Sequence, residues 1–266
     1  MYRFVFILIF GLSSVVSPAL AEKMRTDDPR LVIEAGGHQA VIRKLLFTAD
    51  GSELVSVSDD KTIRIWSVSQ DGRNARLART IRGQIEDGRA GQIAAAALSP
   101  PDESQRQKWL AIGGYLAGPP EARDAIRLHD YASGEVIALL TGHTGNILSL
   151  AFSPSGRWLA SAGKDRTICI WDMTKLDGQQ IRIPPLVLTG HTDRVLEVAW
   201  SPKGDRLASA SYDGTIGLWD TEQIEKGTVT RLKNLKKHSG KVRSIAFHPD
   251  GTVLASGGDD REIRLW

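Results

Sequence analysis

The sequence predicts an all-β protein built from repeated four-stranded units, and three observations support that prediction. Four stretches of the chain align on their tryptophans, and each of these tryptophans has a histidine at the same distance before it. Within each copy, apolar runs of about six residues alternate with tight turns that contain Pro and Gly, as short buried strands do. The single cysteine, Cys169, excludes an internal disulfide, so a buried core must stabilise the chain, and its length can supply one.

The register of the four copies is strict. Each tryptophan has a histidine 28 residues before it, a serine ten residues before it and an aspartate six residues before it. The copies span 37–66, 142–172, 190–220 and 237–266. Four positions that hold their spacing in four copies indicate internal repetition rather than chance.

One copy shows how the strands are expected to follow one another. "ILSLAF" (147–152) reads as a buried strand, and the turn "SPSG" leads into a second strand, "WLASA". The turn "KDRT" leads into a third strand, "ICIW", and "PLVLTGH" supplies a fourth before the next copy. We therefore expect four strands in each unit.

With Gly-His near its start and Trp-Asp at its end, this repeat resembles the WD40 family. The resemblance covers residues 31–266 and implies a β-propeller, in which four-stranded antiparallel blades surround a central channel. The expected repeats are about 31–66, 77–131, 136–172, 186–220 and 230–266.

The resemblance also implies that the matching His, Ser, Asp and Trp of one blade join in a hydrogen-bonded set. The chemistry agrees, because the indole N–H of Trp is a donor, Asp is an acceptor and neutral His can relay between them. These roles are structural, not catalytic. The sets are His38, Ser56, Asp60 and Trp66; His143, Ser161, Asp165 and Trp171; His191, Ser209, Asp213 and Trp219; and His238, Ser256, Asp260 and Trp266.

The second unit departs from the pattern. It lacks Gly-His, it has "LAGPPEARD" (116–124) where the aspartate turn should be, and His129 stands where a tryptophan is expected. We expect this blade to be the least rigid, with segments 82–92 and 115–124 rising together on one rim. Long loops are often functional, but surface loops also tolerate insertions at little cost, and such drift is the favoured interpretation.

The N-terminal residues are typical of a secretory signal peptide. Arg3 precedes an uncharged run over 4–16, and the small-x-small sequence of 19–21 precedes Glu22. An uncleaved membrane anchor is the alternative, but the run is short for a span. The sequence therefore predicts a signal peptide over 1–21, a linker over 22–30 and an exported, periplasmic or secreted protein.

The other end of the chain raises the question of ring closure. The resemblance implies that "LVIEA" (31–35) belongs to the last blade, so in a five-blade ring it would pair beside "REIRLW" (261–266). The Asp that follows the Trp in two other copies is absent after Trp266, as is a polar cap. A repeat array without a capped end exposes bare strand edges. We therefore expect an incomplete ring of five repeats, truncated at its C-terminus.

Charge and composition limit the partner. Without Arg3, 33 Lys and Arg face 31 Asp and Glu, a net charge of +2, and the basic residues form no run, which argues against nucleic acid. The resemblance implies that one rim of the propeller binds partners. Its variable positions are the residue before each network Asp and the residues just after each Gly-His. They hold Arg43, Asp59, Lys164, Arg194, Tyr212, Lys241, Arg243 and Asp259. This set leans basic, so the expected partner is a protein with an acidic surface, although an ordinary solvated rim has the same composition.

The histidine inventory argues against catalysis. Four of the six histidines belong to the blade networks, and no pair has metal-ligand spacing. Cys169 has no His or Cys next to it in the sequence, and no G-x-S-x-G occurs, so no enzyme, metal or cofactor is expected. Two functions remain open: a protein-binding scaffold, or a docking domain of a larger exported protein, similar to WD40 segments that bacteria fuse to caspase-like peptidases or kinases.

Overall fold

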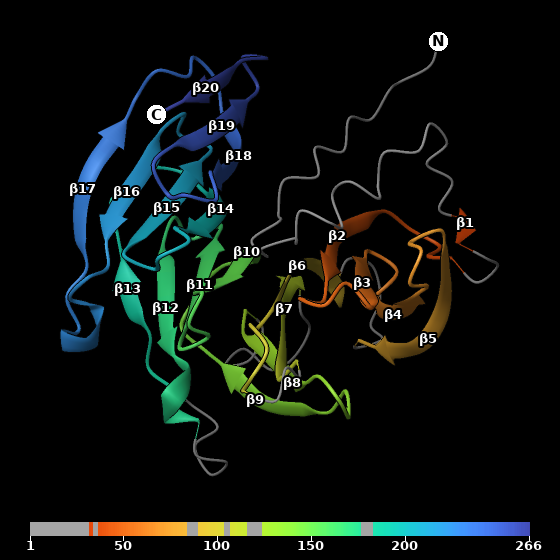
Figure 1. The fold of residues 1–266 in the computed structure, drawn as a ribbon. Coiled ribbons are helices and arrows are strands. Elements are labelled where there is room, and N and C mark those ends of the chain that lie inside the picture. The colour runs from red at the N-terminus through yellow and green to blue at the C-terminus, as the bar shows by residue number, and fades with distance from the viewer. Residues whose placement is uncertain (1–31, 34–36, 84–89, 104–106, 116–123, 177–182) are drawn as a thin grey trace.

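The computed structural model describes residues 32–33, 37–83, 90–103, 107–115, 124–176 and 183–266. These residues form five sheets, each of which is antiparallel apart from one short added strand (Figure 1). We name them blades 1 to 5 in chain order. Blade 1 has the order β1-β5-β4-β3-β2, blades 2 to 4 have four strands each in sequence order, and blade 5 has three among the described residues.

The strands follow one another with short connections. Blade 1 holds β1 (Val32–Ile33), β2 (Ile42–Phe47), β3 (Glu53–Ser58), β4 (Thr62–Val68) and β5 (Asn74–Arg82). Blade 2 holds β6 (Gln92–Leu98), β7 (Trp109–Tyr115), β8 (Ile126–Asp130) and β9 (Val136–Leu140). Blade 3 holds β10 (Ile147–Phe152), β11 (Trp158–Gly163), β12 (Ile168–Asp172) and β13 (Leu186–Leu188), with a 3-10 turn at Met173–Lys175. Blade 4 holds β14 (Val195–Trp200), β15 (Arg206–Ser211), β16 (Ile216–Asp220) and β17 (Thr230–Leu235), with a 3-10 turn at Ile224–Lys226. Blade 5 holds β18 (Val242–Phe247), β19 (Leu254–Gly258) and β20 (Ile263–Leu265).

The core lies between consecutive blades rather than within any one of them. In β15 the side chains alternate between two faces, so that Leu207 packs against blade 3 and Ala208 packs against blade 5. The first strands β2, β6, β10, β14 and β18 follow one another side by side along the arc (Figure 1). Each blade therefore buries both faces only when it has a neighbour on either side, as expected for stacked repeats.

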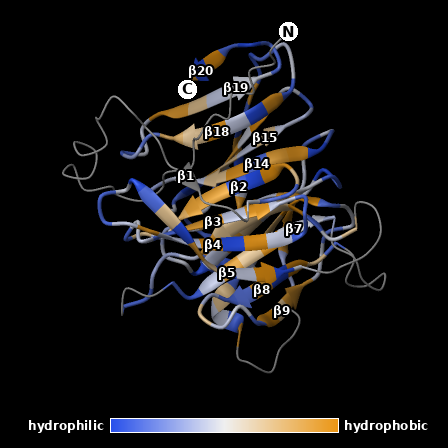
Figure 2. Ribbon diagram, turned by 90° about the vertical axis from the view of Figure 1, so that its right-hand side faces the viewer, coloured by the Kyte–Doolittle hydropathy of each residue, from blue (hydrophilic) through white to orange (hydrophobic). Residues whose placement is uncertain are grey.

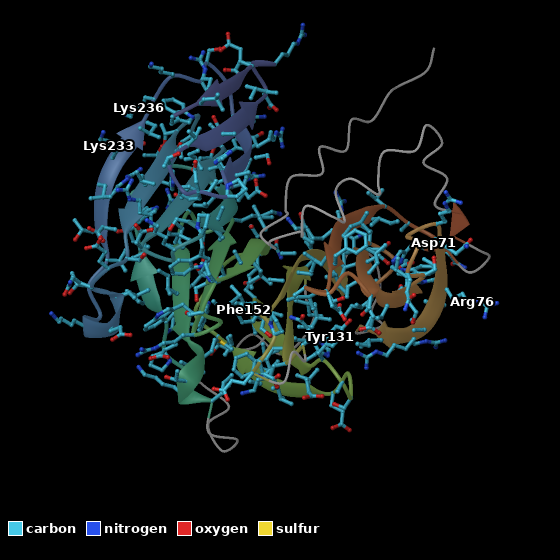
Figure 3. All side chains as sticks on the ribbon, viewed as in Figure 1. Asp71, Arg76, Tyr131, Phe152, Lys233 and Lys236 are labelled. Carbon is cyan, nitrogen blue, oxygen red and sulfur yellow. The ribbon has the colours of Figure 1, made fainter. Side chains whose placement is uncertain are left out.

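The fourth strands form the outer surface of the molecule. Arg76 on β5 and Lys233 on β17 are exposed, and Arg76 points away from the sheets (Figure 3). In blades 1 and 4 the outer strands β5 and β17 carry many polar side chains, whereas β9 and β13 of blades 2 and 3 are apolar in sequence.

One expectation about the ends is wrong. "LVIEA" was expected to join the last blade, but β1 pairs in parallel with β5, with Val32 opposite Asn74 and Ile33 opposite Ala75. The outer edge of β5 offers the unpaired backbone groups that β1 bonds. Among the described residues no strand pairs with the outer edge of β20. The expected signal peptide lies outside the described residues.

Candidate functional site

The side chains expected to form blade networks lie in contact in blade 3. The indole Nε1–H of Trp171 donates to the Ser161 hydroxyl at 3.0 Å, and that hydroxyl lies 2.8 Å from His143 Nε2. The other ring nitrogen, Nδ1, lies 2.8 Å from Asp165, which also accepts from the backbone N–H of Thr144. The chain of contacts thus runs from a third strand, through a second strand, to the loop before the first strand.

The same order of contacts occurs in blades 1, 4 and 5. The three bonds, Trp to Ser, Ser to His and His to Asp, measure between 2.7 and 3.0 Å in each of them. Their members are His38, Ser56, Asp60 and Trp66; His191, Ser209, Asp213 and Trp219; and His238, Ser256, Asp260 and Trp266. Because every member has a partner, the buried polar groups avoid the desolvation cost of an unpaired donor or acceptor.

Electrostatics favour a charged pair in blade 3. Burial by itself would lower the pKa of His143, but its hydrogen bond with Asp165 raises it to about 9. Burial opposes the charge on Asp165 too, yet its hydrogen bond with His143 lowers the pKa of that carboxyl to about 2. Cys169, on the neighbouring strand β12, is fully buried. It is a structural thiol, since nothing exposes it to a substrate.

Blade 2 replaces the network with apolar packing. Ile112 stands where the other blades have the serine, and it is fully buried. His129 is also buried, and its Nδ1–H donates to the Gly134 carbonyl at 2.9 Å. Its Nε2 is buried without a hydrogen-bond partner, and burial lowers its pKa. Most of the loops expected to rise together here, 84–89 and 116–123, lie outside the described residues, so that expectation and the expected low rigidity stay predictions.

The rim residues form two matching ion pairs. In blade 1, Arg43 makes two hydrogen bonds with Asp59, at 2.9 and 2.5 Å. In blade 5, Arg243 makes two with Asp259, at 2.7 and 3.0 Å. These bonds raise the pKa of both guanidinium groups. Part of the basic charge expected on the rim is therefore neutralised within the protein.

Two tyrosine rings each lie close to cations of the rim. The ammonium of Lys241 lies 3.9 Å from the ring centroid of Tyr212, and the guanidinium groups of Arg194 and Arg243 lie 5.3 and 5.9 Å from it. The ammonium of Lys164 lies 4.4 Å from the centroid of Tyr115 and donates to its hydroxyl at 2.8 Å. Cations within about 6 Å of a ring face are attracted to it.

Tyr115 is a rim residue that the sequence reasoning missed. It ends β7 in the register that Lys164 and Tyr212 occupy at the ends of β11 and β15. The signal was available, since "AIGGY" aligns with "ASAGK" and "ASASY". The aspartate that follows this position in the other copies is replaced by Leu116, so the position is not marked by the network pattern.

Three further basic residues were not predicted from the sequence, and they share an unusual backbone conformation. Lys61, Arg166 and Arg261 each follow a network Asp and have φ values of 68°, 70° and 66°. In blade 4 the same position is Gly214, with φ of 80°. A residue other than Gly in the left-handed region is uncommon. The three basic side chains at this position add positive charge to the turns that follow the network aspartates.

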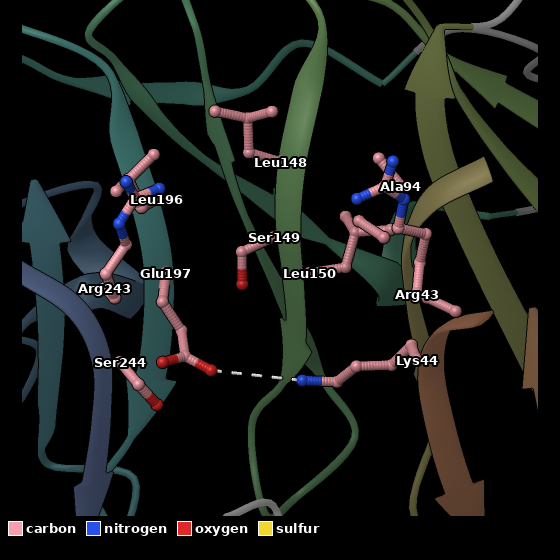
Figure 4. Close-up of a pocket in the computed structure, with 12 residues that line it drawn as sticks. Arg43, Lys44, Ala94, Leu148, Ser149, Leu150, Leu196, Glu197, Arg243 and Ser244 are labelled. Carbon is pink, nitrogen blue, oxygen red and sulfur yellow. Dashed lines mark ion pairs between the residues drawn. The ribbon is translucent and has the colours of Figure 1, made fainter. Parts of the chain in front are cut away.

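The channel between the first strands contains a small cavity of about 140 Å³, shown in Figure 4. Lys44 of β2 reaches across it toward Glu197 of β14, with 3.9 Å between the ammonium and the carboxylate. Glu197 also accepts from the backbone N–H of Ile245 at 2.7 Å. Burial raises the pKa of this carboxyl, although Lys44 favours its charged form. The described part of the chain brings together no group of three or more His, Cys, Asp or Glu that could hold a metal ion.

Comparison with known proteins agrees with the architecture. The family model described as "WD domain, G-beta repeat" matches residues 30–67, 134–172, 182–220 and 229–266, which is more than half of the chain. It does not match the second unit, where the network is absent. Among the described residues no helix is long and apolar enough to cross a membrane.

Several curated proteins resemble part of the chain. Nuclear distribution protein PAC1 of Arthroderma otae is 30% identical over 159 residues, which cover 55% of this chain and 32% of that protein. Telomerase Cajal body protein 1 of Mus musculus is 32% identical over 130 residues, 48% of this chain and 22% of that protein. Pre-mRNA-processing factor 19 homolog 2 of Arabidopsis thaliana is 25% identical over 167 residues, 53% of this chain and 31% of that protein. The matches span about a third of these relatives or less.

Proposed function

Because the chain belongs to the WD40 repeat family, we propose that it is a non-catalytic scaffold that binds a protein partner through the rim built from its second-strand ends and Gly-His loops. Blades 1, 3, 4 and 5 act as a rigid support, since their networks fix the loop before the first strand to the sheet below. Binding residues on loops that a rigid scaffold positions are a common arrangement.

The cluster around Tyr212 carries this proposal. Lys241, Arg194 and Arg243 converge on one aromatic ring, and Asp259 pairs with the first and last of them. The side chain of Arg194 is 50% exposed, and its acidic neighbour Asp193 is 3.9 Å away. Tyr and Arg are enriched among residues that dominate binding energy at interfaces. An excess of cations around an aromatic ring favours a partner that presents carboxylates.

The proposal is tested by reversing charge at the cluster. Arg194→Glu combined with Arg243→Glu should abolish capture of the partner from an extract, while circular dichroism and the thermal midpoint stay close to those of the unchanged protein. A matched control is Lys203→Glu with Arg206→Glu, two exposed residues near the opposite end of the blade 4 strands. Capture that survives at the cluster variant, or that both double variants lose equally, would reject this site.

A second candidate function shares the same rim. In it, the propeller is the docking domain of a larger exported protein whose effector, such as a caspase-like peptidase, lies elsewhere in that protein. The motif of residues 1–21 supports export in either case, because a charged start, an apolar run and a small-x-small sequence are the features that signal peptidase recognises. Expression in a secreting host followed by N-terminal sequencing of the protein recovered from the medium or periplasm should give Glu22; retention of Met1 would reject cleavage after residue 21, and retention of the protein in the cytoplasm would reject export.

A further inference from the structure

A cavity of about 440 Å³ lies between blades 1 and 2, which are neighbours in the structure (Figure 2). Its walls come from the turn that joins β2 to β3, from Pro101 and Gln107 between β6 and β7, and from the residues that follow β8. These segments lie opposite the rim, because the network aspartates are at the other end of the same strands. Ligand pockets commonly measure about 300–1,000 Å³, so the cavity is large enough for a side chain.

The cavity occurs where a regular stacking of turns is interrupted. From blade 2 to blade 5, the proline of one turn packs on the glycine of the next: a Cβ added at Gly156, Gly204 or Gly251 would lie 3.3, 3.6 or 3.5 Å from a ring carbon of the preceding proline. Those prolines are Pro100, Pro154 and Pro202. Blade 1 has Ala49 in place of the proline, and the turn of blade 2 (99–108) is longer and contains no glycine. The turns of blades 1 and 2 therefore do not stack as the others do, and a space remains between them.

A buried tyrosine joins the two blades at the wall of the cavity. Tyr131 is 6% exposed, lies on the side of blade 2 that faces blade 1 (Figure 3) and belongs to a core cluster with Val55 and Ile63 of blade 1. Its hydroxyl donates to Oε2 of Glu53 in blade 1 at 2.7 Å. Burial and this carboxylate raise the pKa of the phenol, so the hydroxyl remains a donor. The bond holds the Glu53 carboxylate at the wall.

Arg79 is the only cationic side chain in the wall that the structure describes. Its guanidinium lies 5.0 Å from the ring centroid of Tyr131. It also donates to the backbone carbonyls of Tyr131 and Ala132. The guanidinium is therefore held against the tyrosine and its backbone and makes no ion pair with Glu53 within the described part of the chain.

Two carboxylates outnumber this cation. Asp50 accepts from the hydroxyls of Thr48 and Ser52, which lowers its pKa and keeps it charged at neutral pH. Glu53 has one oxygen bonded to the tyrosine, and among the described residues its other oxygen, Oε1, accepts no hydrogen bond. The wall thus carries a net negative charge and a carboxylate oxygen with room for a donor.

We propose that this cavity binds the cationic side chain of a second protein, an arginine or a lysine, through the carboxylates of Glu53 and Asp50. Hydrogen bonds between a cationic donor and a carboxylate are stronger than neutral ones, and an anionic ligand would be repelled. The chain then holds an acidic partner on its rim and a basic segment on the opposite face. The inference does not depend on the rim, because no rim residue lines the cavity.

The test titrates the unchanged protein with the blocked tripeptide acetyl-Gly-Arg-Gly-amide and follows amide signals by nuclear magnetic resonance. Saturable shifts are expected at the backbone amides of Ser52 and Ala132 and at the side-chain amide of Gln107. The same peptide with citrulline in place of arginine has nearly the same shape and no charge, so it should bind at least about tenfold more weakly. Because both peptides meet the unchanged protein, this comparison does not require any variant to fold.

A matched pair of variants then locates the site. Glu53→Gln removes the charge but keeps an oxygen that accepts from Tyr131, so the fold should survive and the affinity for the arginine peptide should fall at least about tenfold. The control is Glu222→Gln, the same change at an exposed residue of blade 4, which should bind like the unchanged protein. The proposal is overturned if the cavity signals show no saturable shift, if the citrulline peptide binds equally well, or if the two variants bind alike.

Discussion

Blades 2 and 4 have the same four-stranded topology, but only one of them carries the polar network. In blade 4, Trp219, Ser209 and His191 form a continuous hydrogen-bonded chain under the rim. In blade 2 the corresponding second-strand position is Ile112, and His129 keeps one ring nitrogen without a partner. The comparison teaches that strand pairing and burial between blades determine the fold, whereas the network fixes a loop to the sheet.

The largest expected difference in stability between the two blades comes from the residue near the end of the third strand. Trp219→Ala should lower the free energy of unfolding by about 3–5 kcal/mol, because it removes a buried ring and leaves Ser209 and His191 short of a partner. His129→Ala in blade 2 should cost about 1–2 kcal/mol, because it removes a smaller ring together with an unpaired buried nitrogen. Urea unfolding followed by circular dichroism measures both. Equal losses would mean that His129 supports its blade as Trp219 does.

The effect of pH should differ between blades 2 and 3. The folded pKa of His143 is about 9, above the ordinary value of 6.5. Its contribution to stability is therefore complete below pH 6.5 and is lost as the pH rises through 9, by up to about 3 kcal/mol. Burial lowers the pKa of His129, so the unfolded chain binds this proton more readily, and stability falls as the pH drops below 6.5.

Two variants separate the loss of stability at high pH from the loss at low pH. His143→Gln should flatten the loss of stability between pH 7 and 9.5, and His129→Gln should flatten the loss between pH 6.5 and 5. Both are measured as urea midpoints across the pH series. A curve for His143→Gln that runs parallel to that of the unchanged protein above pH 7 would show that Asp165 does not hold a charged imidazole in the folded state.

The repeat could be predicted from the sequence because it depends on spacing, and the resemblance to the WD40 family then implied which residues join in the networks. A histidine, a serine, an aspartate and a tryptophan in fixed register define one unit wherever it lies. The ion pairs of the rim could not be predicted, because Arg43 and Asp59 meet only after two strands pair. The same is true of Lys44 and Glu197, which come from blades 1 and 4. The position of β1 was predicted wrongly: it pairs with β5 of its own blade and not with the last blade, as the resemblance implied.

The smallest expected effect comes from the turn after each network Asp, where blades 3 and 4 differ again. Arg166 has a φ of 70°, and the left-handed backbone costs a residue with a Cβ about 1–2 kcal/mol. Arg166→Gly removes that strain but frees the unfolded chain, so a net gain of about 0.5–1 kcal/mol is expected. Gly214→Arg should do the reverse and lose more, because its Cβ would lie 3.1 Å from the Gly240 carbonyl oxygen. Unfolding midpoints of the two variants decide the matter. If Arg166→Gly destabilises blade 3, the arginine side chain makes contacts on the rim that outweigh its backbone strain, and the turn then belongs to the binding surface rather than only to its support.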